Sequence, residues 1–200
     1  MIYDIKTILG IAAAVVGFVG YIPYYRDIFR GTTKPHPFSW VGFALLLGIT
    51  FVAQIVTGAG PGAWVTGISA LGVAGIAVLS LSKGHRDITT FDWACFGGAI
   101  LGIVLWRLTS NPLTAVVIVT VTDLLAFAPT YRKAYLRPHE ETASLFVLST
   151  AKYLISLFAL TTFNLTTALF PVSLVLSNVL FVVLIFTRRR ILTKGNGLVH

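Results

Sequence analysis

The chain is poor in the residues that build disulfide scaffolds, metal centres and charged surfaces. Its 200 residues include one cysteine, four histidines and seven acidic residues, and only 11% are charged. The single cysteine, Cys95, excludes an intrachain disulfide framework, and no pair of thiols is present to bind a metal. The histidines fall in expected loops or in the C-terminal tail, and no nucleophile–base arrangement accompanies them. An enzyme is therefore the least favoured class, and no cofactor or metal is expected.

Hydrophobic residues are abundant instead, at 56% of the chain. They come in blocks of about 20 residues, the length at which a helix crosses a hydrocarbon core of ~30 Å. Seven such blocks cannot all be buried in one small soluble core, so we predict an all-α membrane protein with seven transmembrane helices. The blocks cover residues 6–29, 38–57, 63–82, 90–109, 113–135, 142–163 and 168–187.

Basic residues outnumber acidic ones, 15 to 7, but they occupy alternate loops rather than one face, so the sequence supports no nucleic-acid role. By the positive-inside rule the loops rich in Lys and Arg face the cytoplasm. This predicts an external N-terminus, a cytoplasmic tail over residues 191–200, and a location in the plasma or inner membrane. Attraction to anionic lipids at the cytoplasmic face follows. The basic residues on the expected cytoplasmic side are Arg26, Arg30, Lys34, Lys83, Arg86, Arg132, Lys133, Arg137, Arg188, Arg189, Arg190 and Lys194; Lys6 and Arg107 fall on the other.

One motif occurs twice. Pro23, Tyr25 and Arg26 recur at a constant offset as Pro129, Tyr131 and Arg132, and each set is followed by a basic loop and a Pro-His pair. We interpret this as a duplicated membrane unit, a common construction in transporters. The predicted units are residues 1–88 and 112–190, with a linker helix within residues 89–111. Because each unit has three helices, the extra helix keeps the two copies parallel.

The two motif segments, residues 17–40 and 126–144, and the 3+1+3 order of helices resemble the SWEET and PQ-loop superfamily of small transporters. The likeness covers nearly the whole chain in architecture and these two segments in sequence. It implies two three-helix bundles around a central path, with the prolines at positions 23 and 129 as hinges. In sugar-carrying members an asparagine in each third helix holds the sugar, and Asn178 matches that position in the second unit. Tyr153 stands where such members place an aromatic residue.

Two ionisable residues fall near the middle of predicted membrane helices, Asp123 within 113–135 and Lys152 within 142–163. Each would cost about 2.5–3.5 kcal/mol if it faced lipid, so we expect both to face a pore or each other. They form a structural ion pair, they contact substrate or a proton, or one is unpaired and shielded by water; these alternatives remain open. Polar side chains at helical spacing complete the predicted lining of a central cavity: Thr50, Gln54, Thr120, Ser149, Tyr153, Ser156 and Asn178.

Pro23 and Pro129 lie near the same end of their helices, and a proline inside a helix deletes one backbone hydrogen bond. They are expected to act as hinges, with a fixed bend as the alternative. Three tyrosines beside them are the predicted inner gate: Tyr24, Tyr25 and Tyr131. Small-residue stripes predict close helix packing at Gly10, Gly17 and Gly20 and at Gly98 and Gly102. The four tryptophans, Trp40, Trp64, Trp93 and Trp106, lie near helix ends and are expected to anchor at the membrane interface.

The favoured function is therefore a membrane transporter, a uniporter or proton-coupled, that moves a small polar solute by alternating access. A sugar and an amino acid are both compatible with the predicted cavity. The alternative is a seven-helix receptor, sorting or regulatory protein on the same fold. The oligomeric state is left open.

Overall fold

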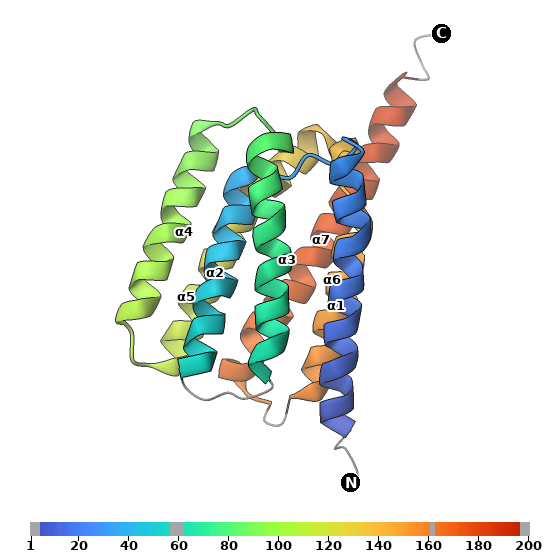
Figure 1. Ribbon diagram of the computed structural model, residues 1–200. Helices are drawn as coiled ribbons and strands as arrows, with labels where there is room; N and C mark the ends of the chain where they lie inside the picture. Colours follow the sequence, from blue (N-terminus) through green and yellow to red (C-terminus); the bar gives the residue numbers. More distant parts are fainter. Residues whose placement is uncertain (1–4, 57–61, 161–162, 197–200) are drawn as a thin grey trace.

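The computed structural model describes residues 5–56, 62–160 and 163–196. These residues form helices and their connections and contain no strand, which confirms the all-α class (Figure 1). A short 3-10 helix, η1 (Pro138–Glu140), lies in the connection before α6. The α-helices are α1 (Ile5–Phe29), α2 (Pro37–Val56), α3 (Gly62–Lys83), α4 (Thr90–Leu108), α5 (Pro112–Leu136), α6 (Ala143–Ala159) and α7 (Leu165–Asn196).

Four of the helices are long and apolar enough to cross a membrane, over Ile5–Phe29, Thr90–Leu108, Leu113–Leu136 and Leu165–Thr193. The described parts of α2, α3 and α6 are apolar but shorter. The ends of α2 and α3 border residues 57–61, and α6 ends just before residues 161–162, both outside the described part. Four candidate spans are thus shown, and seven remains a prediction.

Two helix ends differ from the prediction. Helix α6 ends at Ala159 rather than residue 163, because Leu160 adopts an extended conformation. Helix α7 continues through the Arg188–Arg190 run to Asn196 instead of ending at residue 187. The cause is hydrogen bonding to residues about 50 positions earlier in the sequence. Arg188 donates to the carbonyl of Tyr135, and Arg189 donates to the carbonyls of Pro138 and Glu141, so these arginines dock the helix on the end of α5 and the connection that follows it.

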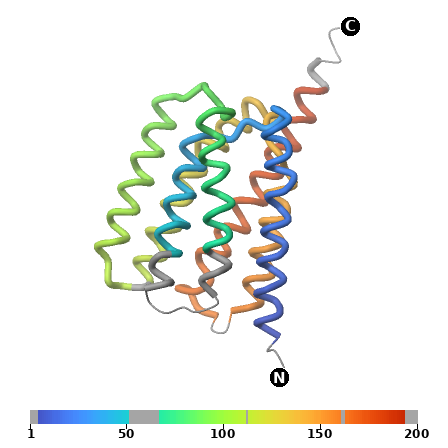
Figure 2. Tube along the Cα trace, in the orientation of Figure 1, coloured from blue at the N-terminus to red at the C-terminus, as the bar shows by residue number. Residues whose placement is uncertain are grey.

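The helices run side by side, and the connections after α1, α3 and α5 lie at the end of the bundle opposite the N-terminus (Figure 1, Figure 2). The C-terminal part of α7 lies at that same end. We call it the basic end, because it carries Arg26, Arg30, Lys34, Lys83, Arg86, Arg132, Lys133, Arg137, Arg188, Arg189 and Arg190.

The neighbours of each helix follow a repeating pattern. Helix α3 packs against α1 and α2, and helix α7 packs against α5 and α6. The two groups meet through α1 against α6 and through α2 against α5, which are equivalent contacts if α1 corresponds to α5 and α2 to α6. Helix α4 lies outside this arrangement, against α5 and α2. We refer to α1–α3 as the first helix group and to α5–α7 as the second.

The tyrosine of each motif makes the same hydrogen bond. The Tyr25 hydroxyl donates to the carbonyl of Gly72, 2.6 Å away, and so ties α1 to α3. The Tyr131 hydroxyl donates to the carbonyl of Ser177 and ties α5 to α7. The helix containing each motif is continuous, with Pro23 inside α1 and Pro129 inside α5.

Glycines allow α1 and α6 to pack closely. A Cβ added at Gly17 would touch the Lys152 side chain, and one at Gly20 would lie 3.3 Å from Cβ of Leu148. The predicted packing role is confirmed at these two positions. It is wrong at Gly10, where a Cβ would meet nothing within 4 Å, because that part of α1 lies against open space.

The α4–α5 contact is equally close. A Cβ at Gly98 would lie 3.0 Å from Cδ1 of Leu125, and one at Gly102 would touch Oγ1 of Thr122. This confirms the predicted packing face of α4.

An aromatic core occupies the half of the bundle nearer the basic end. Phe127, Phe146 and Phe181 contact one another, with ring centroids 4.4–5.7 Å apart, and Tyr24 packs against Trp40 at 5.0 Å. Trp40 is 4% exposed, so its predicted interfacial role is wrong; the start of α2 is covered by α1 and α5 rather than facing the surface. Trp93 is exposed as expected, and Trp64 falls outside the residues whose side chains are described.

Candidate functional site

The predicted ionisable pair lies inside the bundle but not in contact. Asp123 on α5 is 8% exposed and interacts electrostatically with Tyr153 on α6. Lys152, also on α6, places its amine 4.3 Å from the ring centroid of Tyr153, and its stem lies against Gly17 of α1. Tyr153 therefore interacts with both the acid and the amine.

Among the described residues, Asp123 and Lys152 form no ion pair with each other, so the structural-pair alternative is wrong for this conformation. The reason is helical geometry. Neighbouring residues on a helix point about 100° apart. Tyr153 interacts electrostatically with Asp123, and Lys152, one position before it, is turned toward α1, where Gly17 leaves room for its stem.

The other predicted cavity residues mostly bond to their own helices. Thr50, Thr120 and Ser156 donate to helix carbonyls at 2.7, 2.7 and 2.8 Å. Asn178 is buried, and its amide donates to the carbonyl of Leu174 at 2.6 Å. Ser149 is half-buried on α6. The side chain of Gln54 lies outside the described residues.

The three predicted gate tyrosines do not line one constriction. Tyr25 and Tyr131 point within their own helix groups, as their hydrogen bonds to α3 and α7 show. Tyr24 is fully buried and reaches across to the second group, where its hydroxyl donates to the Glu141 carboxylate at 3.2 Å. Of these three tyrosines, only Tyr24 therefore bridges the two groups at the basic end.

Tyr24 belongs to a larger set of contacts between the α1–α2 connection and the α5–α6 connection. The backbone N–H of Lys34 donates to the carbonyl of Glu140 at 3.1 Å, and the Lys34 amine donates to the Glu140 carboxylate at 2.7 Å. Thr142 donates to the carboxylate of Asp27 at 2.8 Å. We call this set the loop cluster: Tyr24, Asp27, Lys34, Lys133, Glu140, Glu141 and Thr142.

Lys133 is the centre of the loop cluster. Its side chain is 0% exposed, and its amine donates to the carbonyl of Lys34 at 2.6 Å and to that of Glu140 at 3.1 Å. It also forms an ion pair with Glu141, which is equally buried. Burial raises the pKa of Glu141, and the charge and hydrogen bond of Lys133 oppose that rise. One ammonium thus satisfies three acceptors from both helix groups.

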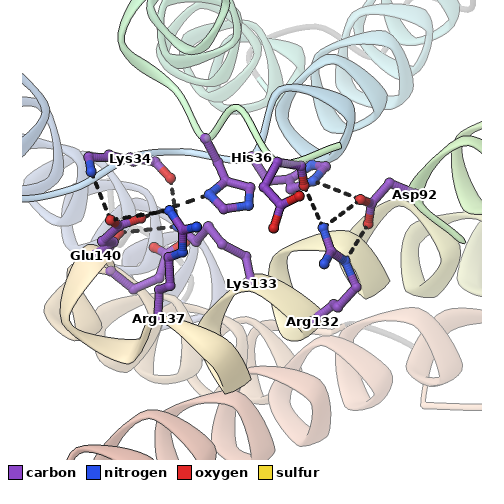
Figure 3. Close-up of polar contacts among 10 residues, drawn as sticks. Lys34, His36, Asp92, Arg132, Lys133, Arg137 and Glu140 are labelled. Carbon is purple, nitrogen blue, oxygen red and sulfur yellow. Dashed lines mark hydrogen bonds and ion pairs between the residues drawn. The ribbon is translucent and has the colours of Figure 1, made fainter. Parts of the chain in front are cut away.

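Two buried histidines, His36 and His85, lie beside the loop cluster, and Figure 3 shows His36 near Lys133 and Asp92. The His36 and His85 ring centroids are 5.7 Å apart, and neither side chain has a hydrogen-bond partner within the described part of the chain. His36 Nε2 lies 3.6 Å from Asp92, and His85 Nδ1 lies 3.8 Å from Glu140. Burial lowers the pKa of His36 to about 4, and burial together with nearby Lys133 and Arg137 lowers that of His85, so both rings are neutral near pH 7.

The acids next to the histidines already have cationic partners. Arg132 donates to both oxygens of Asp92, at 3.0 and 2.7 Å. Burial acts to raise the pKa of Glu140, yet the hydrogen bond and charge of Lys34 hold it below its usual value. Across the described ranges, no group of three His, Cys, Asp or Glu side chains has the geometry to bind a metal ion.

Sequence reasoning missed this buried loop chemistry. It counted Lys133 and Arg132 only as loop charges that set the topology, and it placed His36 and His85 in loops without expecting burial. A signal was present in the acids. Five of the seven fall next to the basic loops, at positions 27, 87, 92, 140 and 141. Acids in so small a number, placed among cations, favour ion pairs over a purely topological role.

Comparison with known protein families, characterised proteins and solved structures finds no match to this chain. Two features of the structure are therefore the candidates for a function. One is a set of ionisable side chains inside the bundle between the two helix groups. The other is a hydrogen-bonded closure between the same groups at the basic end.

Proposed function

We propose that the protein is a membrane transporter that moves a small polar solute, such as a sugar or an amino acid, between its two helix groups by alternating access. In this proposal all seven α-helices cross the bilayer, the N-terminus is outside and the basic end is cytoplasmic. The resemblance to the SWEET and PQ-loop superfamily, and the repeated tyrosine hydrogen bonds across each helix group, support this layout.

The observation that carries the proposal is the position of Asp123 and Lys152. They lie at mid-helix on α5 and α6, and both of these helices contact the first helix group. Ionisable groups at this depth are costly in a membrane protein and are retained where they contact a solute or a proton. Because the two are not paired with each other, a carboxylate and an amine remain to bind complementary groups on a solute.

The loop cluster is the contact that would form and break during the proposed transport cycle. In this structure it joins the two groups at the basic end, which corresponds to a conformation closed toward the cytoplasm. Opening toward the cytoplasm requires its bonds to break, and Pro23 and Pro129 lie where α1 and α5 would bend.

Uptake by liposomes tests the proposal. Purified protein reconstituted in liposomes is expected to take up at least one solute from a panel of labelled sugars and amino acids. Asp123→Asn and Lys152→Ala are expected to abolish that uptake while melting close to the wild type. The matched controls are Asp87→Asn and Lys83→Ala, which remove exposed charges at the basic end and should leave uptake unchanged.

Two results would contradict the proposal in different ways. Uptake no faster than that of protein-free liposomes across the whole panel argues against transport of these solutes. Wild-type rates in both the Asp123 and Lys152 variants would retain transport but remove the assigned site.

A further inference from the structure

The two helix groups each carry a groove on their outer flank, and the two grooves are equivalent in position. The first lies between α1 and α3 and has a volume of about 440 Å³. The second lies between α5 and α7, is bordered by Phe91 of α4, and has a volume of about 800 Å³. Tyr25 lines the first and Tyr131 the second, so the same motif residue marks both.

The second groove extends further along its helices, to Tyr135 and Leu184, and it has smaller side chains at three equivalent positions. Its volume falls in the range typical of ligand pockets, about 300–1,000 Å³. The first groove is partly filled by its own larger side chains at these three positions. The replacements are Leu124 for Phe18, Ala128 for Ile22, and Ser173 for Ile68.

The hydroxyl groups along the second groove are already satisfied. Ser173 donates to the carbonyl of Phe170, Ser177 to that of Leu174, and Tyr131 to that of Ser177. A polar solute would find few free partners along this wall and would have to give up its own hydration. A hydrocarbon chain has no such hydration to lose, so the wall of the groove suits an acyl chain.

The end of the groove nearest the basic end carries positive charge. Tyr135 and Leu184 line this end, and the guanidinium of Arg188 lies 4.0 Å from the Tyr135 ring centroid. Arg132 also lines the groove, but Asp92 neutralises it through two hydrogen bonds. No carboxylate pairs with Arg188 anywhere in the described part of the chain. Basic sites between membrane helices on the cytoplasmic side bind anionic lipid headgroups.

We propose that the α5–α7 groove binds an anionic phospholipid, with an acyl chain along the groove and its phosphate at Arg188. The inference rests on the membrane location in the proposed function, but not on transport. A bound lipid here would lie against Tyr131, next to Pro129, and would therefore touch the helix that the proposed cycle bends.

Native mass spectrometry of the full chain in detergent tests this site, with phosphatidylglycerol and phosphatidylcholine of identical acyl chains as the probes. The wild type is expected to bind phosphatidylglycerol about fivefold more tightly, the factor expected from one arginine near an anionic headgroup. Arg188→Gln should abolish that preference. Arg190→Gln, which removes the same charge from an exposed position, should retain it.

The groove itself is tested by giving it the side chains of its counterpart. Ala128→Ile combined with Ser173→Ile should remove most binding of both lipids, while Arg188→Gln should remove only the preference between them. Equal binding of the two lipids by the wild type, or unchanged binding after the double substitution, would overturn the site and indicate binding to the general surface only. Lipid binding without solute uptake would leave this site intact and contradict the proposed transport.

Discussion

The buried ion pair between Lys133 and Glu141 allows a quantitative test of the loop cluster. Both side chains are 0% exposed, and Lys133 also donates to the carbonyls of Lys34 and Glu140. Lys133→Met keeps the apolar stem but removes all three donated hydrogen bonds. Removing one member of a buried pair leaves an uncompensated charge and costs about 3–5 kcal/mol.

Melting in detergent measures this loss. For a chain of this length, 1 kcal/mol shifts the melting temperature by about 2–4 °C, so Lys133→Met should melt on the order of 10 °C below the wild type. Lys133→Met combined with Glu141→Gln should recover part of the loss, because the orphaned carboxylate is gone while two carbonyls remain without a donor. Arg190→Gln, at an exposed site, should change stability by about 0.5 kcal/mol or less.

The stability deficit of Lys133→Met should also change with pH in a defined direction. Burial raises the pKa of Glu141, and without Lys133 the main opposing charge is lost, so its folded-state pKa rises further. A raised folded-state pKa favours the protonated folded protein, so stability is gained as pH falls and is lost as pH rises through that pKa. The deficit of Lys133→Met should therefore be larger near pH 8 than near pH 5. A variant that melts within about 2 °C of the wild type at neutral pH would refute the reasoning.

Two further predictions concern helix packing and bending. Gly102→Ala places a Cβ against Thr122 and should cost about 1–3 kcal/mol in thermal unfolding, whereas Gly97→Ala, on the same helix with nothing within 4 Å, should stabilise by about 0.4–1 kcal/mol. Equal melting temperatures for the two variants would mean that the α4–α5 contact is loose. Pro23→Ala combined with Pro129→Ala should slow solute uptake by liposomes without loss of folded protein, because each substitution restores a backbone hydrogen bond to a helix expected to bend. Wild-type uptake rates in that double variant would instead support a fixed bend.

The helices and their order could be predicted from sequence because each depends on a local property. Blocks of about 20 apolar residues give the helices, and the motif repeat at Tyr25 and Tyr131 anticipates equivalent positions, which the structure joins to α3 and α7 in the same way. The ends of α6 and α7 were less predictable. Arg188 and Arg189 extend α7 only because carbonyls at the end of α5 and in the connection after it lie within reach, and that proximity depends on tertiary packing.

The interior of the site could be predicted only in part. The sequence identifies Asp123 and Lys152 as costly residues, but it does not give the rotation of each helix, which decides whether Lys152 or Tyr153 faces α5. Burial of loop residues was harder still. Lys133 belongs to a basic stretch that the sequence predicts to be exposed to solvent. It is buried only because the connections after α1 and α5, about a hundred residues apart, contact each other.

The position of Lys133 has a consequence for how the two helix groups can separate. The Lys133 ammonium on α5 donates to the carbonyl of Lys34 in the connection after α1 and to Glu140 and Glu141 in the connection after α5, so it attaches the two connections to each other. Partial separation would leave the buried ammonium one acceptor short while it keeps Glu140 and Glu141, and it would break the Tyr24–Glu141 and Lys34–Glu140 bonds of the loop cluster at the same boundary. In the proposed cycle, opening at this end is therefore all-or-none. Single-molecule distance measurements between the connections after α1 and α5 should show two discrete populations with no intermediate.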